Sequence, residues 1–569
     1  MAREPKHGDR GENWIPPDFN QFGDELWEVA NILRDDAVHS VDRLEIFSLF
    51  LFLKLWDEIE LENEEELGTL PPDEQLIPEI YRFHKWANDP DTYAKNCEFY
   101  DANGKIQKFD DSIAFCRQMF ENLANRTSKH PVNRDIKRLF KDTVFPLRHT
   151  TTVRGLASKL AELNLREIMA RGMAPGSERF DILGRTYEYL LQRFSQNKEF
   201  AEYFTPRHVV DKIIAILEPQ IGETIYDPAC GTGGFIVRAF EYVRNLINQK
   251  KISGDKRENL IRDLKSKQLH GTEFIPLVFK LALMNMILHQ DGSSQLRCDD
   301  SLSSKAQDIE KDKYDVIPAN PPFGPTKQER LGSFEYHIKM YEALFIQHIM
   351  NALKPGGRAA VVLKEGLLFD SKGQLRKICR KLIEQFEVLA VISLPNGVFN
   401  PYSGAKTSVV VFRRPLGRDD VRTSQVWFYR VESDGRDLGA TRRRLADFDT
   451  DGDLENMVSL FPYRWQHQSQ GGVKAILKSD NLADFESKKS WWATLEEIRK
   501  TDYNLTVGRY CPHQAEAVEH EKPAILINRL LELEEEIKTD LQDLLTLVTV
   551  PTTIEGLRGS IHFDIFPAE

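Results

Sequence analysis

The segment YDPACGTGGFIVRAF, at residues 226–240, decides the fold of this chain. A short β-branched run leads into it, and an amphipathic run at residues 237–250 continues from it. Its glycines allow a tight turn and let a ligand approach the backbone closely. A strand, a glycine-rich turn and a helix in this order predict a β-α unit whose turn holds a nucleotide-like ligand. The phosphate-binding patterns GxxxxGK(S/T) and GxGxxG are absent, and an ordinary strand-to-helix turn stays the alternative.

Short apolar runs alternate with helical runs through the middle of the chain, from about residue 180 to residue 415. The strand-like runs lie at residues 224–226, 314–317, 359–363, 388–393 and 407–412. Helical runs such as those at residues 208–219, 279–290 and 341–355 separate them. Strands that alternate with helices predict a mostly parallel sheet with helices on both faces. We therefore expect an α/β fold for this part of the chain.

The regions on either side of this alternation differ from it. Amphipathic stretches follow a polar tail at residues 1–20 and predict a helical N-terminal domain. The acidic run at residues 57–66 is interpreted as a solvated helix end. A mixed region follows residue 415 and ends in an amphipathic helix at about residues 523–548. We expect domains at residues 1–165, 166–415 and 416–569. The C-terminal helix has one apolar stripe that needs a partner surface: Leu530, Leu533, Ile537, Leu541, Leu544 and Val548.

The composition is that of a folded globular protein, since 41% of the 569 residues are hydrophobic and 29% are charged. The longest apolar stretch, at residues 46–56, is far shorter than the roughly 20 residues that a bilayer span needs, so we expect no membrane helix. The polar start lacks a signal core. Six cysteines without a CxxC pair predict neither a zinc site nor disulfides, as in a reducing cytoplasm. The formal charge of −12 argues against a free-standing protein that coats nucleic acid.

Acidic residues follow the next two strand-like runs. Glu273 lies at the end of one run, and Asp299 and Asp300 lie at the end of the next. A carboxylate at the second strand tip can accept hydrogen bonds from both hydroxyls of a ribose, and one at the third tip can accept from an adenine amino group. Taken alone, each acid is more typical of a surface loop. Their order after the glycine turn favours a nucleoside site.

The segment YDVIPANPPFG, at residues 314–324, is the most informative stretch of the chain. Pro321 and Pro322 follow a strand directly, remove two backbone donors and fix the carbonyl of Pro321. Asn320 adds an amide oxygen, so that two acceptors converge on one NH₂ group. Phe323 offers a face on which a planar base can stack. A proline turn with an incidental aromatic residue is a much weaker interpretation of this combination.

The segments DPACGTGG, at residues 227–234, and ANPPFG, at residues 319–324, together resemble the S-adenosylmethionine-dependent DNA methyltransferases that modify amino groups. The surrounding sequence is similar to the modification subunit of type I restriction-modification systems, in particular in the segments AEYFTPRHVV, LKPGGRAAVVL and LPNGVF. The likeness covers about residues 25–415, and DYNLTVGRY extends it loosely. Two positions depart from the family pattern. Ala201 stands where glycine is usual, and Asp299-Asp300 stands where Gly-Asp is usual, which leaves the adenine contact open between the two acids.

The resemblance implies a role for each matching residue. Asn320 and Pro321 would bind the target amine, with Pro322 and Phe323 completing the catalytic motif. The implied cofactor-binding residues are Phe204, Thr205 and Pro206 beside the methionine part, Asp227, Ala229, Gly231 and Gly233 in the turn, Glu273 at the ribose and Asp300 at the adenine. Thr205 also suits the N-cap of a helix with Pro206 at its first position. No metal ion is implied.

Other residues have less definite roles. Phe323 would stack on a flipped base, and Phe399 is a second stacking candidate that fits core packing equally well. Cys230 is interpreted as a small packing residue of the glycine turn. The cluster Arg442-Arg443-Arg444 is more typical of a basic surface than of a phosphate contact.

The implied activity is transfer of a methyl group from S-adenosylmethionine to the N6 amino group of adenine in DNA, by an adenine-specific DNA methyltransferase. No base-reading domain fits between the two motifs, and the region after residue 415 is too short for two such domains. The implied partners are therefore DNA, a specificity subunit, a second modification subunit and, in the full complex, a motor-nuclease subunit. A methyltransferase that acts on protein glutamine or RNA, and a non-catalytic scaffold subunit, stay alternatives.

Overall fold

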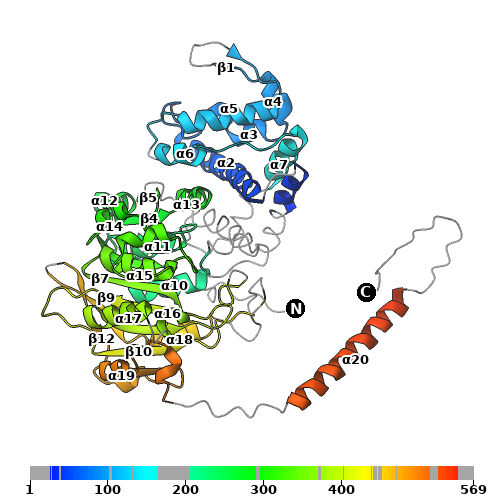
Figure 1. Ribbon diagram of the computed structural model, residues 1–569. Helices are drawn as coiled ribbons and strands as arrows, with labels where there is room; N and C mark the ends of the chain where they lie inside the picture. Colours follow the sequence, from blue (N-terminus) through cyan, green and yellow to red (C-terminus); the bar gives the residue numbers. More distant parts are fainter. Residues whose placement is uncertain are drawn as a thin grey trace. The chain divides into compact units, whose positions relative to one another are not determined.

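Figure 1 shows a computed structural model of the chain. The structure describes residues 26, 28–36, 40–100, 106–130, 132–163, 187, 204–289, 295–369, 373–400, 403–437, 439, 445, 451–469, 471–512 and 523–548. The predicted tail at residues 1–20, Ala201 and the cluster Arg442-Arg443-Arg444 lie outside the described residues. The chain divides into two units, Met1–Cys511 and Pro512–Glu569.

A nine-stranded sheet forms the centre of the larger unit. In spatial order its strands are β13 (Ser490–Thr494), β10 (Gln425–Arg430), β8 (Glu387–Ser393), β9 (Thr407–Arg413), β7 (Leu353–Lys364), β6 (Tyr314–Ala319), β3 (Ile225–Asp227), β4 (Leu269–Glu273) and β5 (Gln295–Cys298). The sheet is mostly parallel, because only β13 with β10, and β9 with its two neighbours, pair in the antiparallel sense. The predicted α/β fold is confirmed.

The order of the strands reverses beside β3. The chain runs outward from β3 to β4 and β5, and then places β6 and β7 on the other side of β3. At such a reversal the connections leave in opposite directions and open a crevice outside the carboxyl ends of the strands. The residues that follow β3 and β6 therefore border the same crevice.

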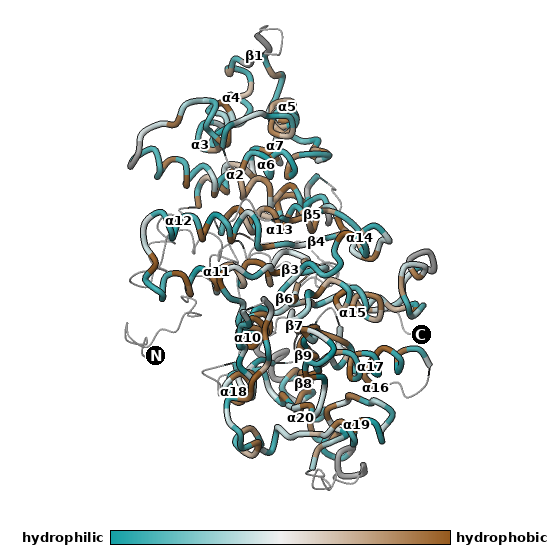
Figure 2. Tube along the Cα trace, turned by 90° about the vertical axis from the view of Figure 1, so that its left-hand side faces the viewer, coloured by the Kyte–Doolittle hydropathy of each residue, from teal (hydrophilic) through white to brown (hydrophobic). Residues whose placement is uncertain are grey.

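Helices cover both faces of the sheet. Successive residues of a strand point to opposite faces. Ile225 accordingly packs in one apolar cluster with α10 (Arg207–Leu217), α11 (Gly234–Gln249) and α13 (Pro276–Leu288). Tyr226 packs in a second cluster with α15 (Tyr341–Ala352) and α17 (Gln374–Gln385). Figure 2 shows apolar stretches along these strands and helices. Because helices cover both faces of the sheet, its strands are almost continuously hydrophobic.

Two features of the sheet differ from expectation. β6 continues through Pro318 to Ala319, although proline lacks a backbone donor. This is possible because β6 pairs with β3 only at Val316 and beyond that residue follows β7 alone. β10 and β13 lie after residue 415 in sequence and nevertheless extend the same sheet. The expected domain limit at residue 415 therefore falls within one sheet.

Shorter elements complete the part of the chain around the sheet. They are α12 (Gly254–Asp263), η4 (Leu264–Gln268), α14 (Ser304–Ile309), η5 (Gln328–Ser333), α16 (Glu365–Phe369), α18 (Asp453–Leu460), the hairpin of β11 (Tyr463–His467) and β12 (Val473–Leu477), η6 (Leu482–Phe485), α19 (Leu495–Lys500) and η7 (Val507–Tyr510). Several of these elements follow residue 415 and pack around the far end of the sheet, at β10 and β13.

The first part of the chain is helical, as predicted. Its elements are η1 (Ile32–Asp36), α2 (Ser40–Leu67), η2 (Glu79–Tyr81), α3 (Phe83–Trp86), α4 (Pro90–Asn96), the ladder of β1 (Phe99–Tyr100) and β2 (Ile106–Gln107), α5 (Ser112–Asn125), α6 (Asn133–Phe140) and α7 (Thr150–Glu162). α2 and α6 pack against α13. Lys280 of α13 places its Nζ 2.6 Å from both Glu45 Oε1 and Thr143 Oγ1, which joins this part to the sheet.

The smaller unit contains the predicted C-terminal helix, α20 (Pro523–Val548). Within this helix, Leu533, Ile537 and Leu541 of the predicted apolar stripe are 48%, 60% and 60% exposed. Among the described helices, none is both long enough and apolar enough to cross a membrane.

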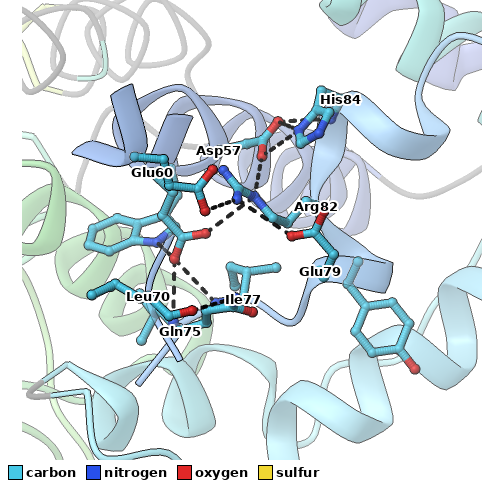
Figure 3. Close-up of polar contacts among 12 residues, drawn as sticks. Asp57, Glu60, Leu70, Gln75, Ile77, Glu79, Arg82 and His84 are labelled. Carbon is cyan, nitrogen blue, oxygen red and sulfur yellow. Dashed lines mark hydrogen bonds and ion pairs between the residues drawn. The ribbon is translucent and has the colours of Figure 1, made fainter. Parts of the chain in front are cut away.

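A buried arginine organises the end of α2 (Figure 3). The side chain of Arg82 is 2% exposed, and its guanidinium lies 3.0 Å from Asp57, 3.5 Å from Glu60 and 2.6 Å from Glu64. The interpretation of residues 57–66 as a solvated helix end is therefore wrong for Asp57 and Glu60. Both are buried, because the guanidinium of Arg82 neutralises their carboxylates.

Replacing this arginine tests the importance of the buried charges. In Arg82→Met, Asp57 and Glu60 stay buried without their counter-charge, and we expect the free energy of unfolding to fall by about 3–5 kcal/mol. Urea unfolding followed by circular dichroism measures the change. Lys85→Met is the matched control, because its partner Glu79 is 53% exposed and such a pair contributes no more than about 1 kcal/mol. Equal losses for the two variants would contradict this prediction.

Candidate active site

Four strand ends lie next to one another at one edge of the sheet, those of β5, β4, β3 and β6. Asp227 is the last residue of β3, Glu273 is the last residue of β4, and Asn320 directly follows β6. Asp300 lies just beyond the end of β5. The fold thus brings the two predicted motifs and both predicted acidic positions to one crevice.

The glycine turn after β3 depends on close backbone packing. Gly231 and Gly233 have φ values of 54° and 86°, in the left-handed region that favours glycine. The N–H of Gly233 donates to the carbonyl of Cys230 at 2.8 Å, which closes the turn. A Cβ on Gly271 of β4 would lie 2.7 Å from Leu296 Cδ2 and 3.1 Å from Cys230 Sγ, so only glycine lets the turn approach β4 this closely. Burial raises the pKa of the Cys230 thiol, which fits a packing role.

The carboxylate of Glu273 fixes the glycine turn to the next β-α unit. Its Oε2 accepts the N–H of Gly231 at 3.0 Å, and its Oε1 accepts the N–H of Ile275 at 2.8 Å. Two oxygens offer about four lone-pair sites, so the carboxylate can still accept hydrogen bonds from a ligand.

The carboxyl of Asp227 lies deeper, with the residue 1% exposed. Its Oδ1 accepts the N–H of Ala229 at 3.0 Å, which lowers its pKa. Burial has the larger effect and, together with the negative charge of Glu273, raises the pKa of Asp227 to about 8. Asp227 is therefore mostly protonated at pH 7 in this state.

The two acids after β5 occupy different environments. Asp300 is half-buried, and its Oδ1 accepts the N–H of Leu302 at 3.0 Å. Asp299 is exposed, and its Oδ1 accepts the N–H of Asp300 at 2.8 Å. The N–H of Asp299 donates to the carbonyl of Glu273 at 3.0 Å, so the β5 tip is tied to the β4 tip.

Asn320 has the most distinctive hydrogen bonding in the crevice. Its Nδ2 donates to Thr205 Oγ1 at 3.0 Å, across a sequence separation of 115 residues. This hydrogen bond fixes the amide orientation, and Asn320 Oδ1 is buried and accepts no hydrogen bond from the residues that the structure describes. A buried acceptor without a donor costs about 1–3 kcal/mol. Pro321 beside it is buried, and Pro322 is exposed. Such an acceptor at a crevice is suited to a ligand N–H group.

The predicted capping role of Thr205 is wrong. α10 begins at Arg207, with Pro206 at the cap position, and no side chain caps the helix. The hydroxyl oxygen of Thr205 accepts from Asn320 instead. Phe204 is partly buried against the apolar cluster that contains α10. Of the three predicted residues, Thr205 therefore lies beside the end of β6, where it orients the Asn320 amide.

Phe323 and Phe399 are in contact, with ring centroids 6.1 Å apart and planes at 89°. Phe399 is only 3% exposed, whereas Phe323 is half-buried and offers the more accessible ring. The Nζ of Lys364, the last residue of β7, lies 5.0 Å from the Phe323 centroid, as in a cation–π contact. Behind this ring, the buried Glu342 accepts the N–H of Gly324 at 3.2 Å and holds the loop in place.

Two supporting residues were given no role from the sequence. Ser301 Oγ donates to the carbonyl of Pro228 at 2.6 Å, and Asn285 Nδ2 donates to the carbonyl of Thr232 at 3.0 Å. Both hold the glycine turn from outside. Asn285 has a weak sequence signal, because it interrupts the apolar helix α13, whereas Ser301 has none beyond its place after Asp300.

The raised pKa of Asp227 predicts a pH-dependent stability. An acid whose pKa rises from its usual 3.8 to about 8 on folding contributes most stability below pH 3.8, and this contribution is lost as the pH rises toward 8. Asp227→Asn removes the titration and keeps the shape. We expect the variant to gain stability over the natural chain as the pH rises from 5 to 8, with the gain constant above 8, in urea unfolding at each pH. A difference independent of pH would contradict the prediction.

The chain has close overall likeness to known proteins. It is 29% identical over 529 residues to the methylase subunit of the Escherichia coli type I restriction enzyme EcoEI, which covers 91% of this chain and 96% of that protein. It is 27% identical over 511 residues to the EcoKI methylase subunit of Escherichia coli strain K12, with 86% and 84% covered.

Solved structures share the fold. One, from a study of complex assembly and conformational transition in the type I R-M system, has a TM-score of 0.60 and 26% identity, and the match covers 94% of this chain and 99% of that chain. A modification subunit of a putative type I restriction enzyme from Vibrio vulnificus YJ016 has a TM-score of 0.64 and 24% identity, with 88% and 99% covered.

Two family models match separate parts of the chain. The HsdM N-terminal domain matches residues 22–142, which include most of the helical part. The N-6 DNA Methylase model matches residues 178–520, which is more than half of the chain and includes the whole nine-stranded sheet and its crevice. The chain belongs to the N-6 DNA methylase family.

Proposed function

We propose that the chain transfers a methyl group from S-adenosylmethionine to the N6 amino group of adenine in DNA, as the modification subunit of a type I restriction-modification system. The observation that carries this proposal is the buried Oδ1 of Asn320, which Thr205 orients and which lacks a donor among the described residues. An exocyclic amine supplies such a donor. The family match, and relatives named as type I restriction enzyme methylase subunits, support the same function.

The crevice residues fit the proposed cofactor. The left-handed glycines of the turn permit close approach of a ligand, and the carboxylate of Glu273, which lies beside the turn, is a suitable acceptor for ribose hydroxyls. The residues proposed to hold the cofactor are Phe204, Thr205 and Pro206 at its methionine part, Asp227, Ala229, Gly231 and Gly233 at the turn, Glu273 at the ribose and Asp300 at the adenine. When bound, S-adenosylmethionine supplies a methyl group that its sulfonium already activates.

The residues of the catalytic motif act on the target amine. The lone pair of an adenine amino group is delocalised into the ring, so the amine is a poor nucleophile. Asn320 Oδ1 and the carbonyl of Pro321 accept its two hydrogens, favour a pyramidal nitrogen and direct the lone pair toward the methyl donor. Phe323 stacks on the flipped base, and this contact offsets part of the few kcal/mol that flipping requires. Phe399 supports the ring of Phe323 from the core.

We also propose the partners and the cellular location. A chain with a formal charge of −12 is expected to bind DNA weakly on its own. A specificity subunit therefore contributes DNA binding and also reads the target sequence. The exposed apolar residues of α20 offer a docking surface for that subunit. A second modification subunit, and a motor-nuclease subunit in the full complex, complete the assembly in the cytoplasm. Regions 1–165, 166–415 and 416–569 serve these roles as helical domain, catalytic domain and assembly region, with the sheet shared across residue 415.

Loss of the amide acceptor tests the catalytic assignment. Asn320→Ala, assembled with the specificity subunit, should lower N6-methyladenine formation by about 10²-fold or more, as expected for a preorganised hydrogen-bonding group. Binding of S-adenosylmethionine, measured by calorimetry, should stay close to that of the natural chain. Tritium transfer from labelled S-adenosylmethionine measures the activity. Unchanged DNA methylation by Asn320→Ala would refute the assignment, and label in RNA or protein glutamine without label in DNA would establish a different substrate.

The hydrogen bond between Thr205 and Asn320 gives a second test. Thr205→Val keeps the shape of the side chain and removes the acceptor for Asn320 Nδ2. The amide is then free to turn its NH₂ toward the target amine, and we expect kcat for methylation to fall about tenfold, the equivalent of one hydrogen bond of about 1.4 kcal/mol. Thr205→Ser keeps the hydroxyl and serves as the matched control, with kcat within about twofold of the natural value. Equal kcat values for the two variants would rule out the orienting role.

A further inference from the structure

A groove on the helical domain is lined by basic side chains. Its volume is about 730 Å³, and its charged lining residues are Lys129, Arg134, Lys137, Arg138 and Lys141. The other lining residues are Ala124, Ser128, His130 and Asn133, so no aspartate or glutamate is among them. We call this surface the basic groove. It stands out in a chain whose formal charge is −12.

Neighbouring acids neutralise only part of the basic groove. Lys129 pairs with Asp73 at 2.6 Å, and the buried Asp135 pairs with both Arg134, at 3.3 Å, and Arg138, at 2.9 Å. Lys137 and Lys141 form no ion pair with any described residue, and Lys141 is exposed while Lys137 is half-buried. The basic groove therefore keeps a surplus of positive charge that is available to an anionic ligand.

The histidine of the groove adds no charge at neutral pH. Burial lowers the pKa of His130, so its ring is neutral at pH 7. Lysine and arginine side chains alone supply the attraction, and the charge of the groove is constant through the physiological pH range.

The basic groove contacts β5, the edge strand whose carboxyl end borders the crevice. Arg138 Nη2 donates to the carbonyl of Leu296 in β5 at 2.5 Å, and its guanidinium lies 4.7 Å from the centroid of Phe279 in α13. β5 ends at Cys298, which is paired with Glu273 at the crevice. A ligand that extends from the crevice past the β5 edge would therefore approach this positive surface.

We propose that the basic groove binds backbone phosphates of the DNA duplex that flanks the adenine in the crevice. This inference rests on the proposed function and adds a second DNA contact to it. A duplex carries one negative charge per about 1.7 Å, so a groove with five cationic side chains, two of them in no ion pair with a described residue, matches it. Extracting one base requires that the rest of the duplex be held, and phosphate contacts hold DNA without reading its sequence. The helical domain thus clamps the backbone, and sequence reading is left to another subunit.

The salt dependence of DNA binding tests this proposal. Each lost phosphate contact lowers the slope of log K against log salt by about 0.9. We expect Lys137→Gln/Lys141→Gln, in the full chain assembled with its specificity subunit, to lower that slope by about 2 units. The decrease should be equal on duplexes with and without the target site. Fluorescence anisotropy of labelled duplexes at several salt concentrations provides the measurement.

Two control variants separate local contact from other effects. Lys137→Arg/Lys141→Arg keeps both charges and should keep the slope, which excludes a folding defect as the cause. Lys250→Gln/Lys256→Gln removes two exposed charges, one directly after α11 and one in α12, outside the basic groove, and should also keep the slope. An unchanged slope in Lys137→Gln/Lys141→Gln, or an equal decrease in the α11–α12 variant, would overturn the proposal.

The proposed function is judged separately. At saturating DNA and low salt, Lys137→Gln/Lys141→Gln should form N6-methyladenine at the natural rate, because neither lysine lies in the crevice. Absence of methylation by the natural complex would refute the proposed function, and the slopes measured on non-target duplex would still decide whether the basic groove binds phosphates.

Discussion

The reversal of strand order beside β3 is the constraint on which the rest of the site depends. Because β4 and β6 flank β3, the loops after β3 and β6 border one crevice although they are 93 residues apart in sequence. In a strand order that separated β3 from β6, the glycine turn and the Asn-Pro-Pro-Phe segment would not border one crevice. Two-sided coverage by helices then makes the strands apolar and leaves their carboxyl ends as the place for polar chemistry.

Within the crevice, polar groups are held by one another and by backbone amides before any ligand arrives. Glu273 is fixed by two backbone N–H groups, and Asn320 is fixed by Thr205. Protonation of Asp227 avoids the repulsion that a second carboxylate charge next to Glu273 would produce. Side chains oriented in this way lose little further entropy on binding, so the binding energy of a ligand is available for positioning the reacting groups.

Local sequence patterns predicted the helices and strands. Features that depend on contacts distant in sequence could not be predicted in this way. The apolar runs and the glycine turn predicted β3, the helix after it and the α/β class, because hydrophobic period and turn chemistry are local properties. Asp227, Glu273 and Asn320 were correctly placed at strand ends, because strand ends can be located from such runs. Thr205 was misassigned as a helix cap, since its actual partner lies 115 residues away.

The same limit explains the other differences. The acidic run at residues 57–66 contains no sign of Arg82, which lies in a later segment and buries Asp57. Likewise, nothing local in the runs that become β10 and β13 shows that they join the sheet, because the partner of a strand is not specified by the strand's own sequence. Contacts between residues that are distant in sequence therefore could not be predicted from local sequence patterns.

The local charge on the surface of this protein differs from its average charge. The formal charge of −12 describes the whole chain, yet the lining of one groove carries five lysine and arginine residues and no acid. At physiological ionic strength the Debye length is about 8 Å, so a phosphate in that groove responds to the local cations far more than to acids elsewhere on the surface. An acidic chain can therefore hold DNA at a chosen place and repel it elsewhere, which favours binding in one orientation over general coating of the duplex. In the proposed orientation, the crevice and the basic groove, which β5 connects, bind the same duplex.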